Sequence, residues 1–114
     1  MYGTVIEGKL ELHEGVPSLE RMQEVVGGLI ETAQRYPTER KDIGVDVYCN
    51  EEGLMLGLPV EHIRQLDRAP IVGNLVIVGG NDRTGDAVSL FENEIRAYSQ
   101  YLVNVPPISA ELFF

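Results

Sequence analysis

The chain has 114 residues, of which 44% are hydrophobic and 24% charged. This is enough for one folded domain with a core and too short for two, and it argues against wholesale disorder. Nine basic against eighteen acidic residues give a net charge of −9, which repels phosphate groups and disfavours direct binding to DNA or RNA. No apolar run is long enough to cross a bilayer, and the first residues lack the pattern of a secretory signal. We therefore expect no membrane association and a cytoplasmic location.

Cysteine and histidine are too few for most metal and disulfide chemistry. Cys49 is the single cysteine, so no internal disulfide can form, and the two histidines, His13 and His62, are distant from it in the sequence. We expect neither a metal ion nor a cofactor.

The first third of the chain predicts a strand and then a helix. Apolar and polar residues alternate over residues 2–12, which is typical of a half-buried strand, with a pinch at Gly8. Ser18 is placed to cap a helix that runs to about Val26. Gly27 and Gly28 then end this helix, since adjacent glycines inside a helix cost about 1 kcal/mol each and Gly27 suits a left-handed terminal position.

Next come a strand over residues 29–33 and a polar loop over residues 34–42. We expect this loop to be the most mobile segment. The loop is followed by a strong hairpin pattern, in which two short apolar runs, GVDVYC and LMLGL, flank Asn50-Glu51-Glu52-Gly53. Asn50 suits the first position of a type I turn and Gly53 the fourth, where it supplies a positive φ.

The second half alternates between strands and helices. A short helix is expected over residues 60–66 after Pro59, and a central strand, covered on both faces, over the uniformly apolar residues 71–78. A loop over residues 79–86 and a short strand at residues 87–88 follow. Ser89 and Glu92 have the spacing of a capping box, which predicts a final helix. Its expected apolar stripe consists of Phe91, Ile95, Tyr98 and Leu102.

These elements predict one α+β domain over residues 1–107. Short connections favour a mostly antiparallel sheet of about five strands with two or three helices packed on one side. The apolar tail over residues 108–114 is expected to dock on its own domain or on a second copy. Its candidate interface residues are Ile108, Leu112, Phe113 and Phe114.

Four segments resemble a family found in phages, plasmids and bacterial genomes, domain of unknown function 3846. They are SLERMQEVVGGLIE (18–31), VYCNEEGLMLGLP (47–59), IVGNLVIVGG (71–80) and AVSLFENEI (87–95). One departure is that Glu61 and His62 stand where the family often has an asparagine. The resemblance implies a small accessory protein of a mobile element that acts in the host cytoplasm, and it implies no particular activity.

Three residue groups have weak catalytic or metal-binding patterns. Cys49 with His62 lacks an orienting partner, and the apolar neighbours of Cys49 favour a buried, inert thiol. Glu51 and Glu52 are adjacent in a turn and do not converge as an acid–base pair would. The segment DRTGD, with Asp82, Thr84 and Asp86, lacks the glycine and glutamate of a calcium loop. We therefore expect no enzyme.

A ligand site is a further possibility at the glycine-rich segment GGNDRTG, whose amides could surround an anion, although it lacks the lysine of a P-loop. Its candidate residues are Asn74, Asn81, Asp82 and Arg83.

Three functions remain open. The leading hypothesis is a non-enzymatic accessory protein that binds a host protein, with homodimer formation through the tail. The second is capture of a small molecule such as a nucleotide. The third is mimicry of DNA by the acidic surface, although the carboxylates are scattered rather than arrayed in long runs.

Overall fold

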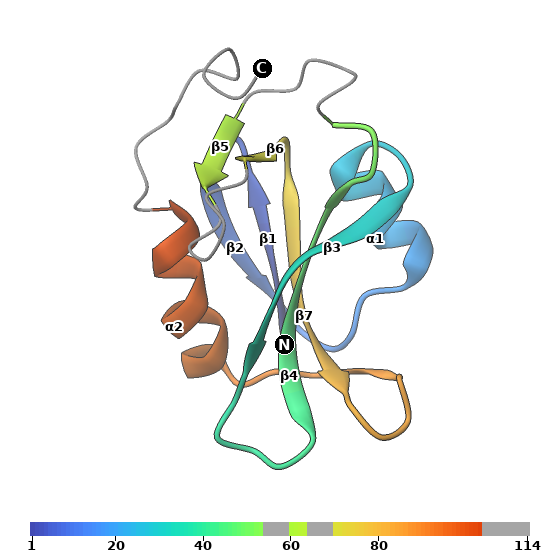
Figure 1. Cartoon of the computed structure of the whole chain (residues 1–114), viewed down its shortest axis with the longest axis vertical. Helices are drawn as coiled ribbons and strands as arrows, with labels where there is room; N and C mark the ends of the chain where they lie inside the picture. Colours follow the sequence, from blue (N-terminus) through green and yellow to red (C-terminus); the bar gives the residue numbers. More distant parts are fainter. Residues whose placement is uncertain (54–59, 64–69, 104–114) are drawn as a thin grey trace.

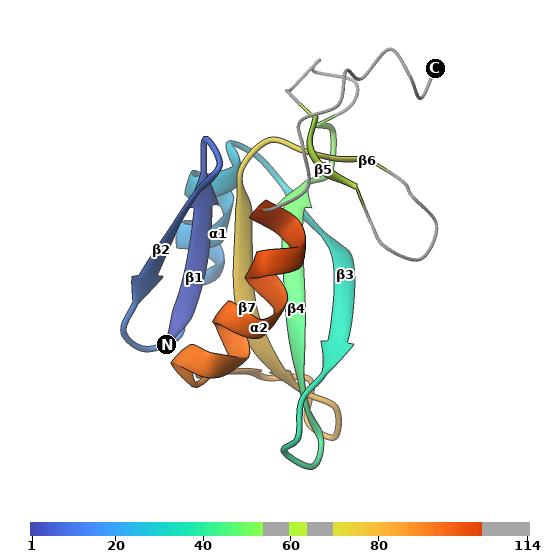
Figure 2. The same cartoon turned by 90° about the vertical axis from the view of Figure 1, so that its left-hand side faces the viewer.

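A computed structural model describes the backbone of residues 1–53, 60–63 and 70–103, and the side chains of residues 1–53 and 73–97 (Figures 1 and 2). The strands are β1 Tyr2–Ile6, β2 Lys9–His13, β3 Ile30–Pro37, β4 Ile43–Asn50, β5 Val60–Ile63, β6 Pro70–Val72, β7 Leu75–Asn81 and β8 Ala87–Val88; the helices are α1 Leu19–Val26 and α2 Glu92–Val103. The predicted tail, residues 108–114, lies outside the described residues, as does the LMLGL half of the predicted hairpin. The GVDVYC half lies in β4, which pairs with β3 on one side and with β7 on the other, so the predicted hairpin pairing of this segment was wrong.

The main sheet has the strand order β2-β1-β7-β4-β3, with β8 also paired to β7, and every pairing is antiparallel. The central strand β7 lies between β1 and β4, as Figures 1 and 2 show. Strands β5 and β6 form a separate two-stranded sheet. The predicted α+β class with a mostly antiparallel sheet is confirmed.

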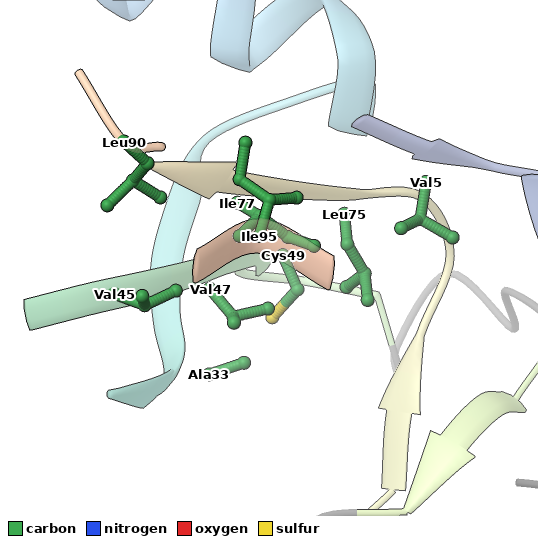
Figure 3. Close-up of a cluster of buried hydrophobic side chains, with 9 residues drawn as sticks. All are labelled: Val5, Ala33, Val45, Val47, Cys49, Leu75, Ile77, Leu90 and Ile95. Carbon is green, nitrogen blue, oxygen red and sulfur yellow. The ribbon is translucent and has the colours of Figure 1, made fainter. Parts of the chain in front are cut away.

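The two helices lie on opposite faces of the sheet, so the expectation that they share one side was wrong. Leu75 and Ile77 of β7 belong to a core cluster with Ile95 of α2 (Figure 3). The alternate residues Val76 and Val78 belong to a second cluster, which contains three α1 residues, Met22, Val25 and Val26. A strand that is apolar at every position needs cover on both faces, and one helix on each side supplies it.

Helix α1 begins and ends where its sequence predicts. The Ser18 Oγ accepts a hydrogen bond from the Arg21 amide at 3.0 Å, which caps the first turn. Gly27 has φ +78°, and its amide donates to the Gln23 carbonyl at 2.8 Å. The Gly28 amide donates to the same carbonyl at 3.0 Å. Both glycines therefore end the helix, as expected.

The predicted strand over residues 2–12 is in fact a hairpin of β1 and β2. Glu7 (φ +50°) and Gly8 (φ +79°) form its two-residue turn. Two successive positive φ values are typical of a type I′ turn, whose twist matches that of the paired strands. The alternating pattern continues across the turn, so periodicity alone did not reveal the reversal.

Three other boundaries differ from the predictions. β3 continues to Pro37, so only residues 38–42 remain as the loop between β3 and β4. Residues 60–63 of the predicted helix over 60–66 form β5, because pairing with β6 overrides a weak helical period. Gly73 (φ +76°) separates β6 from β7, and β7 extends through Gly79 and Gly80 to Asn81.

Candidate functional site: Phe91, Arg40 and the loop between β3 and β4

The four predicted ligand residues do not gather in one place. Asn74 precedes β7 and Asn81 ends it, so the length of this strand separates them by about 20 Å. The Asn74 Nδ2 donates to the Val25 carbonyl at 3.1 Å, and its Oδ1 accepts from the Glu7 amide at 3.1 Å. Asn74 therefore links the end of α1 to the β1–β2 turn, which is a structural role.

The other three predicted ligand residues lie in the loop between β7 and β8. The Asn81 Oδ1 accepts hydrogen bonds from the amides of Arg83 at 2.9 Å and Thr84 at 3.2 Å, an arrangement that stabilises the turn. Asp82 forms an ion pair with Arg35 of β3, and the Arg83 side chain is exposed.

Gly79 and Gly80, part of the predicted anion-binding segment, lie within β7 and are needed for close packing. A Cβ on Gly79 would lie 2.7 Å from the Val88 carbonyl oxygen of β8. A Cβ on Gly80 would lie 2.9 Å from Nη1 of Arg35 and collide with the Asp46 carboxylate. Packing accounts for both glycines without an anion.

Asn50 begins the predicted turn and also links it to α1. Its Oδ1 accepts from the Glu52 amide at 2.7 Å, and its carbonyl accepts from the Gly53 amide at 3.1 Å. Its Nδ2 donates to the Val26 carbonyl at 3.0 Å. A Cβ on Gly28 would lie 2.9 Å from this Nδ2. The hydrogen bonds of the predicted turn are therefore present, but the positive φ expected at Gly53 is not: the described glycines with positive φ are Gly8, Gly15, Gly27, Gly73 and Gly85. The segment that ends α1 is packed against this turn.

Cys49 has a structural environment. The residue is 6% exposed, and its Sγ lies 3.8 Å from Oε1 of Glu31. The prediction of a buried thiol is confirmed. Glu51 and Glu52 are exposed at the tip of the turn, as expected.

A first polar cluster, absent from the sequence predictions, surrounds Arg35. Its guanidinium forms ion pairs with Asp46 and Asp82, and its Nη2 lies 3.4 Å from the Gly80 carbonyl oxygen. The hydrogen bond that Arg35 donates to Asp46 is the largest cause that raises the pKa of Arg35. Asp46 is only 6% exposed, so its carboxylate depends on this partner.

A second polar cluster, also unpredicted, joins the β3–β4 loop to α2. The Arg40 Nε and Nη2 donate to the two carboxylate oxygens of Glu94 at 3.0 and 2.8 Å. Nη2 also donates to the Ser89 carbonyl at 3.1 Å. The Arg40 Cζ lies 4.3 Å from the centroid of the Phe91 ring, within the range of a cation–π interaction. The Phe91 ring is therefore held in position although the residue is 58% exposed.

The start of α2 explains why Phe91 faces outward. The Ile95 amide donates to the Phe91 carbonyl at 3.2 Å, and Oε1 of Glu94 accepts from the Phe91 amide at 2.7 Å. Glu94 thus forms the carboxylate half of a capping box on the Phe91 amide, and the predicted Ser89–Glu92 capping box was wrong. Phe91 occupies the cap position before the first turn and does not follow the helical period that buries Ile95. The prediction of Phe91 as a core residue was wrong.

Two hollows adjoin Arg40. The larger, about 400 Å³, lies at the β3–β4 loop, and its lining includes Arg35, Arg40, Asp42 and Asp82. The smaller, about 280 Å³, is lined by Thr38, Glu39, Arg40, Phe91, Asn93, Glu94 and Ala97. We call the residues of the smaller hollow the Phe91 surface.

Replacing Glu94 with glutamine is expected to lower the free energy of unfolding at pH 7 by about 1–3 kcal/mol, because the charged hydrogen bonds to Arg40 are lost. Burial by itself raises the pKa of Glu94, but hydrogen bonds from Arg40 and the Phe91 amide outweigh it and lower the pKa below its ordinary value of 4.5. The stabilisation is therefore present above pH 4.5 and lost as the pH falls through the lowered pKa. Urea unfolding from pH 7 to pH 3 should show the two proteins converging in acid; a constant difference would contradict this.

The described part of the chain is a small α+β domain with a six-stranded antiparallel sheet and one helix on each face. The family model described as domain of unknown function (DUF3846) matches residues 3–103, which covers the described elements from β1 to α2 except Tyr2, the first residue of β1. The chain belongs to this family. Neither the curated proteins nor the solved structures gave a match.

Two further findings concern membranes and metals. Neither α1 nor α2, the helices in the described part of the chain, is long and apolar enough to cross a bilayer. Within that same part, no three His, Cys, Asp or Glu residues are grouped so that they could share a metal ion.

Proposed function

We propose that this chain is a non-enzymatic accessory protein that binds a host protein through the Phe91 surface. The observation that carries the proposal is the Phe91 ring, which is 58% exposed yet stacked 4.3 Å from the Arg40 guanidinium carbon. Aromatic and arginine side chains dominate the binding energy of protein interfaces, most effectively when they are rigid before binding. Glu94 supplies that rigidity, since it fixes Arg40 with two hydrogen bonds.

The family to which the chain belongs supports a partner from the host cell. The resemblance to proteins of phages and plasmids suggests that the partner belongs to the host cell, with a role in host takeover or in blocking a host defence. We propose a cytoplasmic location for this encounter. The net charge of −9 favours a partner with a basic surface, because opposite charges speed association and exclude wrong partners.

Affinity capture from host lysate, followed by mass spectrometry, tests the proposal. We expect the tagged chain to retain a protein, and Phe91→Ala to retain it at least about 10-fold less, the loss typical of an interface hot spot. Leu19→Ala is the matched control, because Leu19 is similarly exposed, at 55%, but lies on α1 at the opposite face of the sheet.

Equal capture by Phe91→Ala and the unchanged chain would contradict the proposal, provided that circular dichroism shows the variant folded. Recovery of a small molecule instead of a protein would favour the ligand-capture hypothesis. Release of a captured protein by added duplex DNA would favour DNA mimicry.

A further inference from the structure

We infer that two copies of this chain associate through strand β2, which pairs antiparallel with β2 of the second copy. The inference goes beyond the proposed function and is independent of it, because the Phe91 surface lies on the β3–β4 loop and the start of α2. It depends on the open edge of β2, on the regularity of that edge and on the charges of Lys9 and Glu11.

Strand β2 is an edge of the main sheet, and Figure 2 shows it at the outer margin. Ile6 and Lys9 flank a two-residue turn and therefore exchange hydrogen bonds, and hydrogen-bonded pairs alternate along an antiparallel ladder. The amides and carbonyls of Leu10 and Leu12 consequently point away from β1. Within the described part of the chain, no hydrogen bond engages these four groups, so they are available to a further strand.

Strand β2 lacks two features that protect exposed edges in many sheets. Its five residues pair with β1 without a register shift, and none of them is proline. The opposite edge, β3, is interrupted by a shift in register at Ala33 and ends in Pro37. A regular edge strand with open backbone groups can pair with another chain. Of these two edges, β2 is therefore the one suited to pairing.

Charged side chains on β2 select the strand that can pair there. Lys9 and Glu11 are exposed on the same face of the sheet, and neither forms an ion pair with another described residue. Like charges directly opposite each other destabilise a sheet, so these side chains exclude many incoming strands. Two opposite charges, two residues apart, are complementary to the same pair on a strand of opposite direction. A second copy of β2 therefore fits this edge.

The symmetric register centred on Leu10 gives the best match of charges. With Leu10 on the two-fold axis, each Lys9 lies opposite Glu11 of the second copy, which gives two ion pairs across the interface. A register with Leu10 opposite Leu12 would place the two Glu11 carboxylates together. A register centred on Leu12 would place Glu11 opposite His13, whose ring is already engaged within its own chain.

Sedimentation velocity at about 0.15 M salt, over a wide range of protein concentration, tests the inference. The net charge of −9 on each copy opposes association, but such long-range repulsion is largely screened at this ionic strength. We expect a reversible equilibrium between monomer and dimer. Lys9→Glu should weaken the dimer at least about 10-fold, because two attractive charge pairs become repulsive. Lys41→Glu, on the exposed β3–β4 loop, makes the same change in net charge and should leave the dimer unaffected.

A mixture of two variants tests the register itself. Glu11→Lys alone should weaken the dimer as Lys9→Glu does, because each change creates two pairs of like charge. In a mixed dimer of the two variants, the introduced glutamate faces the introduced lysine, and the native lysine faces the native glutamate. We therefore expect the mixture to dimerise as tightly as the unchanged chain, with one variant fluorescently labelled to identify the mixed species.

Three outcomes would overturn the inference, once circular dichroism shows each variant folded. The first is a monomer at every concentration. The second is a dimer that Lys9→Glu leaves unchanged, which would place the interface elsewhere, for example at the tail over residues 108–114. The third is a mixture of the two variants that associates no more tightly than either variant alone.

Discussion

Replacing Arg35 with alanine is expected to lower the free energy of unfolding by about 3–5 kcal/mol, because Asp46 would keep a buried carboxylate without its partner. Asp46 is 6% exposed, whereas the other carboxylate bound to this guanidinium, Asp82, has a side chain that is 56% exposed. Water can replace Arg35 at Asp82 but reaches Asp46 poorly. Urea unfolding at pH 7 measures the difference.

Two further variants make this result diagnostic. Asp82→Asn removes an exposed ion pair of the same guanidinium and should cost less than about 1 kcal/mol. Adding Asp46→Asn to Arg35→Ala should restore part of the lost stability, because a neutral amide costs less to bury than a charge. If Arg35→Ala loses no more than Asp82→Asn, the burial of Asp46 is not the source of the cost.

Gly79→Ala is expected to destabilise the fold by about 3 kcal/mol, the upper part of the usual range for overpacking. The added Cβ would lie 2.7 Å from the Val88 carbonyl oxygen and 2.8 Å from Cδ2 of Leu90. The first of these neighbours is backbone in a paired strand, so it can move only if β8 separates from β7.

Gly85→Ala is the matched control for Gly79→Ala. Gly85 has φ +77° but no atom within 4 Å of an added Cβ, so alanine there should cost only about 1–2 kcal/mol for its backbone conformation. Thermal unfolding of both variants provides the comparison. Equal losses would indicate that close packing is not what requires glycine at Gly79.

Local signals in the sequence predicted the two ends of α1 and the turn at Asn50. The limits of α1 depend on a Ser18 hydroxyl three residues from its amide partner and on Gly27 in a left-handed conformation. The turn at Asn50 depends on a hydrogen bond that the Asn50 side chain accepts from the Glu52 amide, two residues later. Such contacts are made within one segment, and they are readable without knowledge of the fold.

The candidate site could not be predicted in this way, because its contacts join residues far apart in the chain. Arg40 and Glu94 are 54 residues apart, and the segment around Arg40 reads as an ordinary polar loop. The one weak indication of this site in the sequence is an aromatic residue, Phe91, directly before the first turn of a helix. The predicted ligand residues Asn74 and Asn81 are close in sequence, yet an intervening strand separates them.

The sequence by itself determined the α+β class, the central apolar strand, the ends of α1 and the turn at Asn50, since each depends on composition, periodicity or a contact within a few residues. Only the tertiary structure decided that the helices cover opposite faces, that residues 2–12 reverse at Glu7 and Gly8, and that Phe91 faces outward on Arg40. Those outcomes depend on which strands pair and on which buried charges find partners. Such choices minimise the free energy of the whole chain and leave little trace in any one segment.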